Sequence, residues 1–312
     1  MIFADTFYKS LFGTKTYKIS LDAGCTCPTR DGTLGTGGCI FCGEKGSGEF
    51  AACKNLSVTE QIKEAKRLVD LKFSRKVLRG IPVQKKYIAY FQNFTNTYGD
   101  LKSLEQKWRA ALAEPDITGL ALGTRPDCIS DECLKILSSL QKEGNFIQLE
   151  LGFQTSNELT AEYFRRGYKN NVYFDAVQRI HKINPSIHVV THLIFGLPTG
   201  LTEFNGIESE AQMLDSVRSV VNAKSDGIKI ANLFVLKNTG LSELYENKVF
   251  RALEYNEYLK LIQNALEILP ENMVVHRLSG DPPRAELIAP SWSTDKKRVM
   301  NDIRKITEKF IH

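Results

Sequence analysis

Short apolar runs alternate along this chain with longer segments in which apolar residues recur at helical spacing. The short runs are rich in β-branched and aromatic residues and nearly continuous, as expected of parallel strands covered on both faces. These strand-like runs span residues 17–21, 87–91, 117–122, 146–152, 187–195 and 228–235. The amphipathic segments span residues 58–77, 101–113, 130–143, 172–184 and 208–223. The alternation predicts an α/β fold built around a parallel sheet.

Two architectures fit repeated strand-then-helix units: an open doubly wound sheet and a barrel. A dinucleotide-binding sheet would carry G-x-G-x-x-G after its first strand, and a P-loop NTPase would carry a Walker A sequence. Neither motif occurs in the chain. The expected fold is therefore an incomplete (β/α)6-type TIM barrel with a C-terminal extension.

The barrel is expected to occupy residues 1–240, and the rest of the chain has a different pattern. Residues 241–312 contain a helical pattern (255–269), a short strand (273–276), a Gly/Pro-rich turn (279–283) and a closing basic helix (295–310). We expect this segment to form an α/β extension packed on the barrel.

The composition is that of an ordinary globular protein, with 42% apolar and 25% charged residues in 312. No apolar run approaches the ~20 residues of a membrane-spanning helix, and the N-terminus lacks a secretory signal. We therefore expect a cytoplasmic protein without a membrane partner. The net charge of +5 comes mostly from residues 63–86 and 296–309. Such stretches are usually solvated helix faces, but they also fit a polyanionic partner.

A long glycine-rich loop, residues 22–57, follows the first strand and holds five of the seven cysteines. In a β/α barrel, the loops after the strands carry the active site. Cys39 and Cys42 form a C-x-x-C, and Cys27 precedes them in the same loop. In a reducing compartment, clustered thiols are more often metal ligands or catalytic groups than disulfides. Soft thiolates select iron–sulfur clusters or zinc.

The number of thiols separates these two metals. A structural zinc site is closed by four ligands, yet no second C-x-x-C follows, since Cys128 and Cys133 are spaced differently and lie far downstream. Three ligands leave one metal position open, as catalysis requires. The alternatives are a coincidental turn or a redox pair. Cys25, Cys53, Cys128 and Cys133 fit better as small buried side chains, with Cys25 the nearest candidate for a further ligand.

At these residues the sequence resembles the radical S-adenosylmethionine (SAM) superfamily, and within it the Elongator-like bacterial family of YhcC/YtqA type. The cluster-loop stretch is KISLDAGCTCPTRDGTLGTGGCIFCGEKGSG (18–48). The resemblance continues through YFQNFTNTY (90–98), ALGTRPDC (121–128), LELGFQT (149–155), RRGY (165–168), THLIFGLP (191–198), KIANLFVLKNT (229–239) and HRLSGDPP (276–283). One departure is Cys25, where the family usually has an aromatic residue.

The resemblance implies a role for individual residues. Cys27, Cys39 and Cys42 would bind three irons of a [4Fe–4S] cluster, and SAM would chelate the fourth iron. Contacts with SAM are implied for Gln92, Thr95 and Asn96 (amino group), Gln154 (ribose and carboxylate), Arg166 (carboxylate), His192, Gly196 and Pro198 (strand-five motif, beside adenine) and Leu236 (strand six). Without the resemblance, the arginines would be ion-paired and the histidines structural.

Glu150 is a polar residue in an otherwise apolar strand. A carboxylate facing the inside of a barrel needs a partner, so Glu150 pairs with an arginine or faces substrate.

The resemblance also implies a reaction. Reductive cleavage of SAM would give methionine and a 5′-deoxyadenosyl radical that abstracts hydrogen from carbon, with an electron donor such as flavodoxin or ferredoxin. Relatives are connected with wobble-uridine modification in transfer RNA, including conversion of a carboxymethylaminomethyl group to aminomethyl, so tRNA is the expected partner. Two alternatives stay open: a radical SAM enzyme of a small metabolite, and a non-catalytic zinc-stabilised nucleic-acid-binding module.

Overall fold

Parallel strands form one curled sheet in the computed structural model, which describes residues 1–44, 46, 55–74, 85–201 and 203–310. Within these ranges the sheet has eight strands in the order β1-β9-β7-β6-β5-β4-β3-β2, and all neighbours are parallel. The strands are β1 (Ile2–Phe3), β2 (Thr16–Leu21), β3 (Lys86–Phe91), β4 (Ile117–Thr124), β5 (Phe146–Gln154), β6 (His188–Phe195), β7 (Gly227–Asn232) and β9 (Val274–Arg277). A separate antiparallel pair joins β8 (Val235–Leu236) to β10 (Leu287–Ala289).

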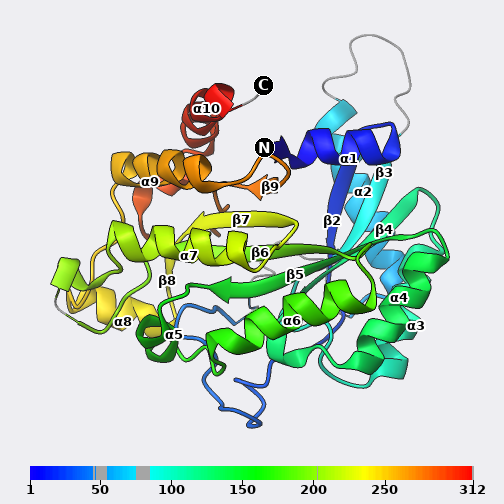
Figure 1. Cartoon of the computed structure of the whole chain (residues 1–312), viewed down its shortest axis with the longest axis horizontal. Helices are drawn as coiled ribbons and strands as arrows, with labels where there is room; N and C mark the ends of the chain where they lie inside the picture. Colours follow the sequence, from blue (N-terminus) through cyan, green and yellow to red (C-terminus); the bar gives the residue numbers. More distant parts are fainter. Residues whose placement is uncertain (45, 47–54, 75–84, 202, 311–312) are drawn as a thin grey trace.

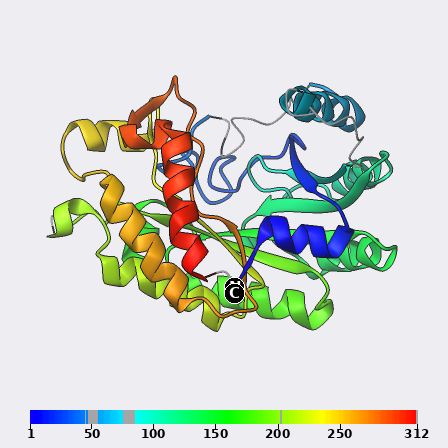
Figure 2. The ribbon, with the colours of Figure 1, turned by 90° about the horizontal axis from the view of Figure 1, so that it is seen from above.

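The helices lie mainly on the convex side of the sheet (Figures 1 and 2). They are α1 (Ala4–Phe12), α2 (Val58–Ser74), α3 (Leu101–Leu112), α4 (Asp131–Lys142), α5 (Glu158–Tyr163), α6 (Asn170–Ile183), α7 (Glu210–Asn222), α8 (Gly240–Glu246), α9 (Tyr255–Ile268) and α10 (Lys296–Thr307). In Figure 2 the blue segment that follows β2 crosses the concave side of the sheet. The predicted incomplete barrel is therefore confirmed.

The predicted elements recur with small shifts in their ends. Ser130 caps α4 through its side chain, which accepts from the backbone N–H of Cys133, as its place before two acidic residues indicates. The predicted helix over 58–77 is observed as far as Ser74, and residues 75–84 lie outside the described ranges. The predicted strand over 228–235 is divided, because the chain leaves the sheet after Asn232 and re-forms as β8 beside β10.

Two strands extend the sheet beyond the six that the sequence predicts. β9 comes from the segment expected to be an extension, and it pairs with β7 on one side and β1 on the other. β1 has two residues, too short to show a period. The division of the chain at residue 240 stays a prediction.

Alternate residues of β5 point to opposite faces of the sheet. Ile147, Leu149 and Leu151 are fully buried in the main core under the helices. Gln148 and Glu150 therefore point to the concave side, which is the inside of the partial barrel. β4 leaves room there, because its register partners of Phe146, Gln148 and Glu150 are Gly119, Ala121 and Gly123. A Cβ at Gly119 would lie 2.6 Å from the carbonyl oxygen of Phe146.

Helix α1 closes the amino-terminal end of this interior. Tyr8 packs with Ile88, Tyr90 and Ala121 in a second apolar cluster, against which Phe7, Phe12 and Phe146 also lie. The Tyr8 hydroxyl donates a hydrogen bond of 2.7 Å to Oε1 of Gln148. The N-terminal helix thus forms the floor of the barrel.

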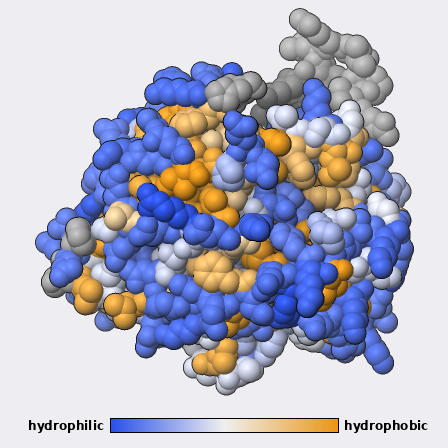
Figure 3. Space-filling model, viewed as in Figure 1, coloured by the Kyte–Doolittle hydropathy of each residue, from blue (hydrophilic) through white to orange (hydrophobic). Residues whose placement is uncertain are grey.

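The outer face over α6 and α7 is mostly hydrophilic, with small separate hydrophobic patches (Figure 3). Among the described residues, no helix is long and apolar enough to cross a lipid bilayer.

Replacing Tyr8 with Ala should destabilise the fold by about 3 kcal/mol, because a buried aromatic ring and a buried hydrogen bond are both lost. Urea unfolding measures this change. Leu11→Ala on the same helix is the control, since Leu11 is 49% exposed and should cost less than about 1 kcal/mol. Equal losses in the two variants would contradict the floor role of Tyr8.

Candidate functional site

The cysteine segment leaves the carboxyl end of β2 and folds against the residues after α5. Its first turn closes on Cys27, whose carbonyl accepts from the N–H groups of Arg30 and Asp31. The N–H of Ile40 donates to the carbonyl of Phe164 at 3.2 Å. Gly38 adopts a φ of +69°, and a Cβ there would lie 2.9 Å from Nε of Arg30. Glycine is therefore required where the loop turns over the arginine.

The thiols of Cys39 and Cys42 interact directly. The pKa of Cys42 lies below its ordinary value, first because Cys39 hydrogen-bonds to its sulfur and then because Arg30 places positive charge nearby. Arg30 also donates to the carbonyls of Cys42 and Gly43, at 3.1 and 2.8 Å. The charge of Cys27 acts on Cys39. The same hydrogen bond with Cys42, together with burial, raises the pKa of Cys39 well above its ordinary value, so positive charge favours the thiolate at Cys42.

Three thiols are a soft donor set of the kind that binds an iron–sulfur cluster. Within the described ranges, no three or more His, Cys, Asp or Glu side chains stand close enough to hold one metal ion. In a [4Fe–4S] cluster each thiolate binds a different iron. Three thiols in one loop at the carboxyl end of β2 suit this arrangement.

Burial raises the pKa of each of the other described cysteines. Burial raises the pKa of Cys25 to about 11 and the pKa of Cys128 and Cys133 to about 12. Cys133 is fully buried in the main core. Cys53, also considered from the sequence, lies outside the described residues.

The residues predicted after the second strand tie strand ends together. The Asn96 amide donates to the carbonyls of Phe91, Asn93 and Gly123. Thr95 is buried, and its N–H donates to the carbonyl of Thr26 in the cysteine loop. Gln92 is half-buried, and its Oε1 accepts from Ser20 at 2.9 Å. These residues connect β2, β3, β4 and the cysteine loop, and their contacts with SAM stay predictions.

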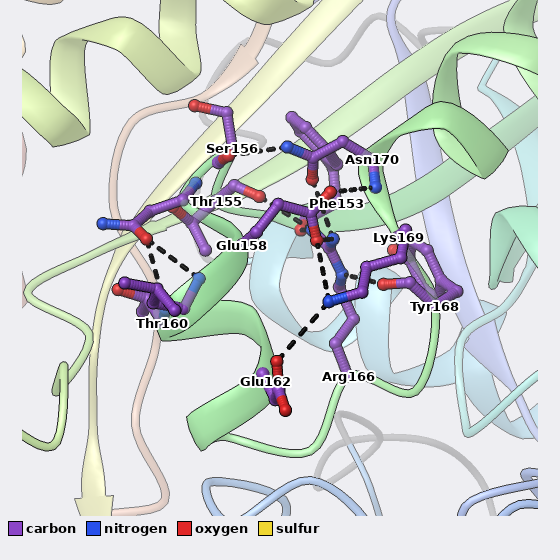
Figure 4. A network of polar contacts seen from close by, with 12 residues as sticks. Phe153, Thr155, Ser156, Glu158, Thr160, Glu162, Arg166, Tyr168, Lys169 and Asn170 are labelled. Atoms are coloured by element: carbon purple, nitrogen blue, oxygen red, sulfur yellow. Dashed lines mark hydrogen bonds and ion pairs between the residues drawn. The ribbon is translucent and has the colours of Figure 1, made fainter.

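Arg166 is 1% exposed and lies in a network at the carboxyl end of β5 (Figure 4). Its guanidinium donates to the carbonyls of Phe153, Thr155 and Tyr168 and to Oδ1 of Asn170, and lies 3.5 Å from Oε2 of Glu158. It thereby holds the end of β5 against the start of α6. Gln154 adopts a φ of +63° at this end. The pairing of either residue with SAM stays a prediction.

The remaining predicted SAM residues come from the fifth and sixth predicted strands, which are β6 and β7–β8 in the structure. They divide into two groups. Gly196 and Leu236 contact the outer elements: the N–H of Gly196 faces Met213 Sδ on α7 at 3.3 Å, and Leu236 pairs with β10. Pro198 bridges to Ile207. His192 instead points into the barrel, where its Nε2 lies 2.9 Å from Oε2 of Glu150.

Glu150 is the centre of the polar interior. Its side chain has no exposed surface, and both Lys18 of β2 and Lys229 of β7 form ion pairs with it. Gln148 donates to its Oε1 at 2.6 Å. The two ammonium groups and His192 lower the pKa of the carboxyl well below its usual value, against the effect of burial. The sequence indicated either an arginine partner or contact with substrate for Glu150, and in the structure its ion-pair partners are two lysines rather than an arginine.

Lys18 and Lys229 were missed as site residues. Each is a lysine within an apolar strand, TYKISL and GIKIAN, and the reasoning applied to Glu150 would have identified them. Arg125 was also missed. It forms a two-point ion pair with Asp127, at 2.9 and 2.7 Å, and its guanidinium lies over the Tyr168 ring, 5.1 Å from the ring centroid. Its signal was a lone arginine three residues after the predicted strand 117–122.

A buried acid lies behind the end of β5. Glu208 is 2% exposed, and its Oε1 accepts from the Thr155 hydroxyl at 2.6 Å. Burial raises the pKa of Glu208 to about 7.

Comparison with known proteins agrees with this geometry. The family model described as "Radical SAM superfamily" matches residues 32–203, and the model described as "Radical_SAM C-terminal domain" matches residues 225–309. The chain is 36% identical to the uncharacterized protein YtqA of Bacillus subtilis, over 95% of this chain and 86% of that protein. It is 30% identical to protein YhcC of Escherichia coli, over 91% of this chain and 85% of that protein. The predicted family is confirmed.

More distant relatives include proteins with named activities. The tRNA uridine(34) acetyltransferase of Methanocaldococcus jannaschii is 25% identical over 61% of this chain and 33% of that protein. The structure of Elp3 from the archaeon Methanocaldococcus infernus covers 95% of this chain and 63% of that chain, with a TM-score of 0.65 and 17% identity. The structural likeness supports the partial barrel.

Replacing Glu150 with Gln should destabilise the protein by about 3 kcal/mol, because two buried ammonium groups lose their counter-charge. Urea unfolding at pH 7 gives the difference. The matched control is Glu64→Gln, which breaks the exposed pair with Arg67 and should change stability by less than about 0.5 kcal/mol. A neutral outcome for Glu150→Gln would show that the carboxylate is not the counter-charge.

Replacing Glu208 with Gln should stabilise the protein in a pH-dependent way. The folded pKa of about 7 exceeds the unfolded value, so folding favours the protonated acid and wild-type stability falls as pH rises from about 4.5 to 7. The variant avoids this loss. At pH 8 it should be more stable by up to about 3 kcal/mol, and at pH 5 nearly equal. Chemical unfolding at both pH values measures this, and a pH-independent difference would contradict it.

Proposed function

This chain belongs to the radical SAM superfamily, and from that premise we propose that it acts on the side chain of a wobble uridine in transfer RNA. It is an iron–sulfur enzyme whose cofactors are a [4Fe–4S] cluster and SAM. When bound, they supply reductive cleavage of SAM to methionine and a 5′-deoxyadenosyl radical for hydrogen abstraction. The residues of the chain itself bind, orient and shield the reactants.

We assign Cys27, Cys39 and Cys42 as the iron ligands. Two observations support this assignment. The thiols of Cys39 and Cys42 are in contact, and Arg30 donates hydrogen bonds to the carbonyls of Cys42 and Gly43. The single observation that carries the proposed chemistry is the loop itself, which follows the carboxyl end of β2, where barrel enzymes keep their active sites, and contains Cys27, Cys39 and Cys42.

The predicted SAM residues would do two kinds of work. Gln92 and Gln154 are half-buried amides at the carboxyl ends of β3 and β5, suited to hydrogen-bond a ligand. Asn96 and Arg166 donate to backbone carbonyls and would keep those strand ends in place. Because the strand ends that carry the ligand-binding amides are held in place, a bound cofactor would keep one orientation.

The tRNA substrate is supported by a relative's named activity and by surface charge. The relative is the tRNA uridine(34) acetyltransferase, matched over part of its length. On α10, the side chains of Arg304 and Lys305 are 77% and 75% exposed and could reach phosphates, and each lies beside a carboxylate, Glu308 and Asp302 respectively. We propose a cytoplasmic location. The electron donor would be a small electron-transfer protein such as flavodoxin or ferredoxin, since the cluster must be reduced for each cleavage.

The test is anaerobic reconstitution with iron and sulfide, reduction, addition of SAM and measurement of 5′-deoxyadenosine. Wild type should release it, whereas Cys39→Ala should fall to the protein-free background because the cluster loses a ligand. Cys133→Ala is the matched control, since this core thiol lies outside the loop, and should retain release. Release by Cys39→Ala would refute the ligand assignment.

The substrate is tested in the same assay. Adding tRNA with a modified wobble uridine should change the mass of that nucleoside in proportion to 5′-deoxyadenosine formed. If release is normal but the tRNA is unchanged, the tRNA proposal is wrong, and a small metabolite becomes the substrate class.

A further inference from the structure

Arg125 is a buried charge at the carboxyl end of β4. It follows the last residue of that strand and is 8% exposed. Its ion-pair partner, Asp127, lies only two residues further along the chain, so the pair fixes the side chain of Arg125 without joining distant segments. Arg166 and Asn96 differ, because they donate to carbonyls at several strand ends. Since a buried ion pair adds little to stability by itself, stability does not account for a buried arginine here.

The guanidinium of Arg125 lies against a segment that also contacts the cysteine loop. A Cβ at Gly167 would lie 3.4 Å from Nη2 of Arg125 and 3.3 Å from Cγ2 of Thr29, so both side chains border the same space beside this glycine. The Thr29 hydroxyl in turn lies 3.2 Å from Sγ of Cys27. Sγ of Cys39 donates to the carbonyl two residues before Gly167, at 3.6 Å. Residues 165–167 therefore bring Arg125 and the thiol loop together.

The charge of Arg125 is felt at all three thiols. It acts on Cys39 and Cys42, and the charge of Cys27 acts on Arg125 in return. Salt screens exposed charges beyond about 10 Å, but it screens buried charges much less. Arg30 acts on Cys42 as well, but its guanidinium also holds the backbone of the loop. Arg125 is thus a charge beside the thiols that can be changed without cutting a hydrogen bond to the loop backbone at 42–43.

We propose that Arg125 raises the reduction potential of a [4Fe–4S] cluster bound by Cys27, Cys39 and Cys42. This inference rests on the ligand assignment made under the proposed function. In the reduction, one electron passes from the electron-transfer protein, which is oxidised, to the cluster, whose charge falls by one, and no covalent bond changes. Because a fixed positive charge nearby stabilises the more negative form, Arg125 favours the reduced cluster.

The ion-pair partner of Arg125 separates an electrostatic role from a structural one. Asp127 brings a negative charge to the same place and offsets part of the effect of Arg125. Removing the charge of Arg125 should disfavour the reduced cluster, whereas removing the charge of Asp127 should favour it. A purely structural role predicts no such opposition, because either change breaks the same ion pair.

The test is a redox titration of the anaerobically reconstituted protein without SAM or RNA, in which electron paramagnetic resonance measures the reduced cluster. At a given ambient potential, Arg125→Gln should hold about tenfold less reduced relative to oxidised cluster than wild type, which is about 59 mV for one electron. Asp127→Asn should shift the midpoint in the opposite direction, and Arg125→Lys should shift it less than Arg125→Gln. The control is Arg109→Gln, which removes an arginine paired with Glu105 and Glu143 on the surface and should leave the midpoint unchanged.

An unchanged midpoint in Arg125→Gln, or shifts of the same sign in Arg125→Gln and Asp127→Asn, overturns the proposal. If Arg125→Gln fails to fold or to bind iron, Asp127→Asn decides alone: a raised midpoint supports the proposal, and an unchanged or lowered one refutes it. Failure of the ligand assignment gives a different result, in which Cys39→Ala keeps the iron content and the signal of wild type. Failure of the tRNA proposal leaves this titration unaffected, because no RNA is present.

Discussion

A buried carboxylate that must be neutralised organises the interior of this protein. Glu150 has no exposed surface, and its charge is tolerable only because Lys18 and Lys229 reach it from strands far apart in the sheet order. The sheet has to curl for both to do so. The ion pairs therefore connect the two sides of the partial barrel across its interior, and the apolar residues on the other face of the same strands pack under the helices.

Neighbouring residues leave space for the side chains around Glu150 and close the amino-terminal end of the barrel interior. Small residues on the inner face of β4, Gly119, Ala121 and Gly123, let longer side chains pass over that strand. Tyr8 on α1 fills the amino-terminal end and bonds Gln148, which in turn bonds Glu150. The opposite end is left to the cysteine loop, so the open side of the interior faces the loop cysteines and the residues that we propose bind SAM.

The carboxyl-terminal edge of the sheet is held by backbone contacts. Arg166 and Asn96 donate to carbonyl groups at the ends of β3, β4 and β5, and Arg30 does the same at 42–43. Because Arg166 and Asn96 are buried and Arg30 is half-buried, these hydrogen bonds keep the strand ends and the thiol loop in a fixed relation. Chemistry that passes through a reactive radical needs such a site, where reactants are oriented and water is excluded.

Local patterns in the sequence were enough for the strand-then-helix order, the Ser130 cap and the cysteine loop, because apolar period, capping and ligand spacing act over a few residues. They also showed that Glu150 needs a partner. Only the tertiary structure decided which partner: Lys18 and Lys229 lie 132 and 79 residues away, and no local pattern records a contact at that distance. The same reason applies to β1 and β9, whose pairing joins the two ends of the chain.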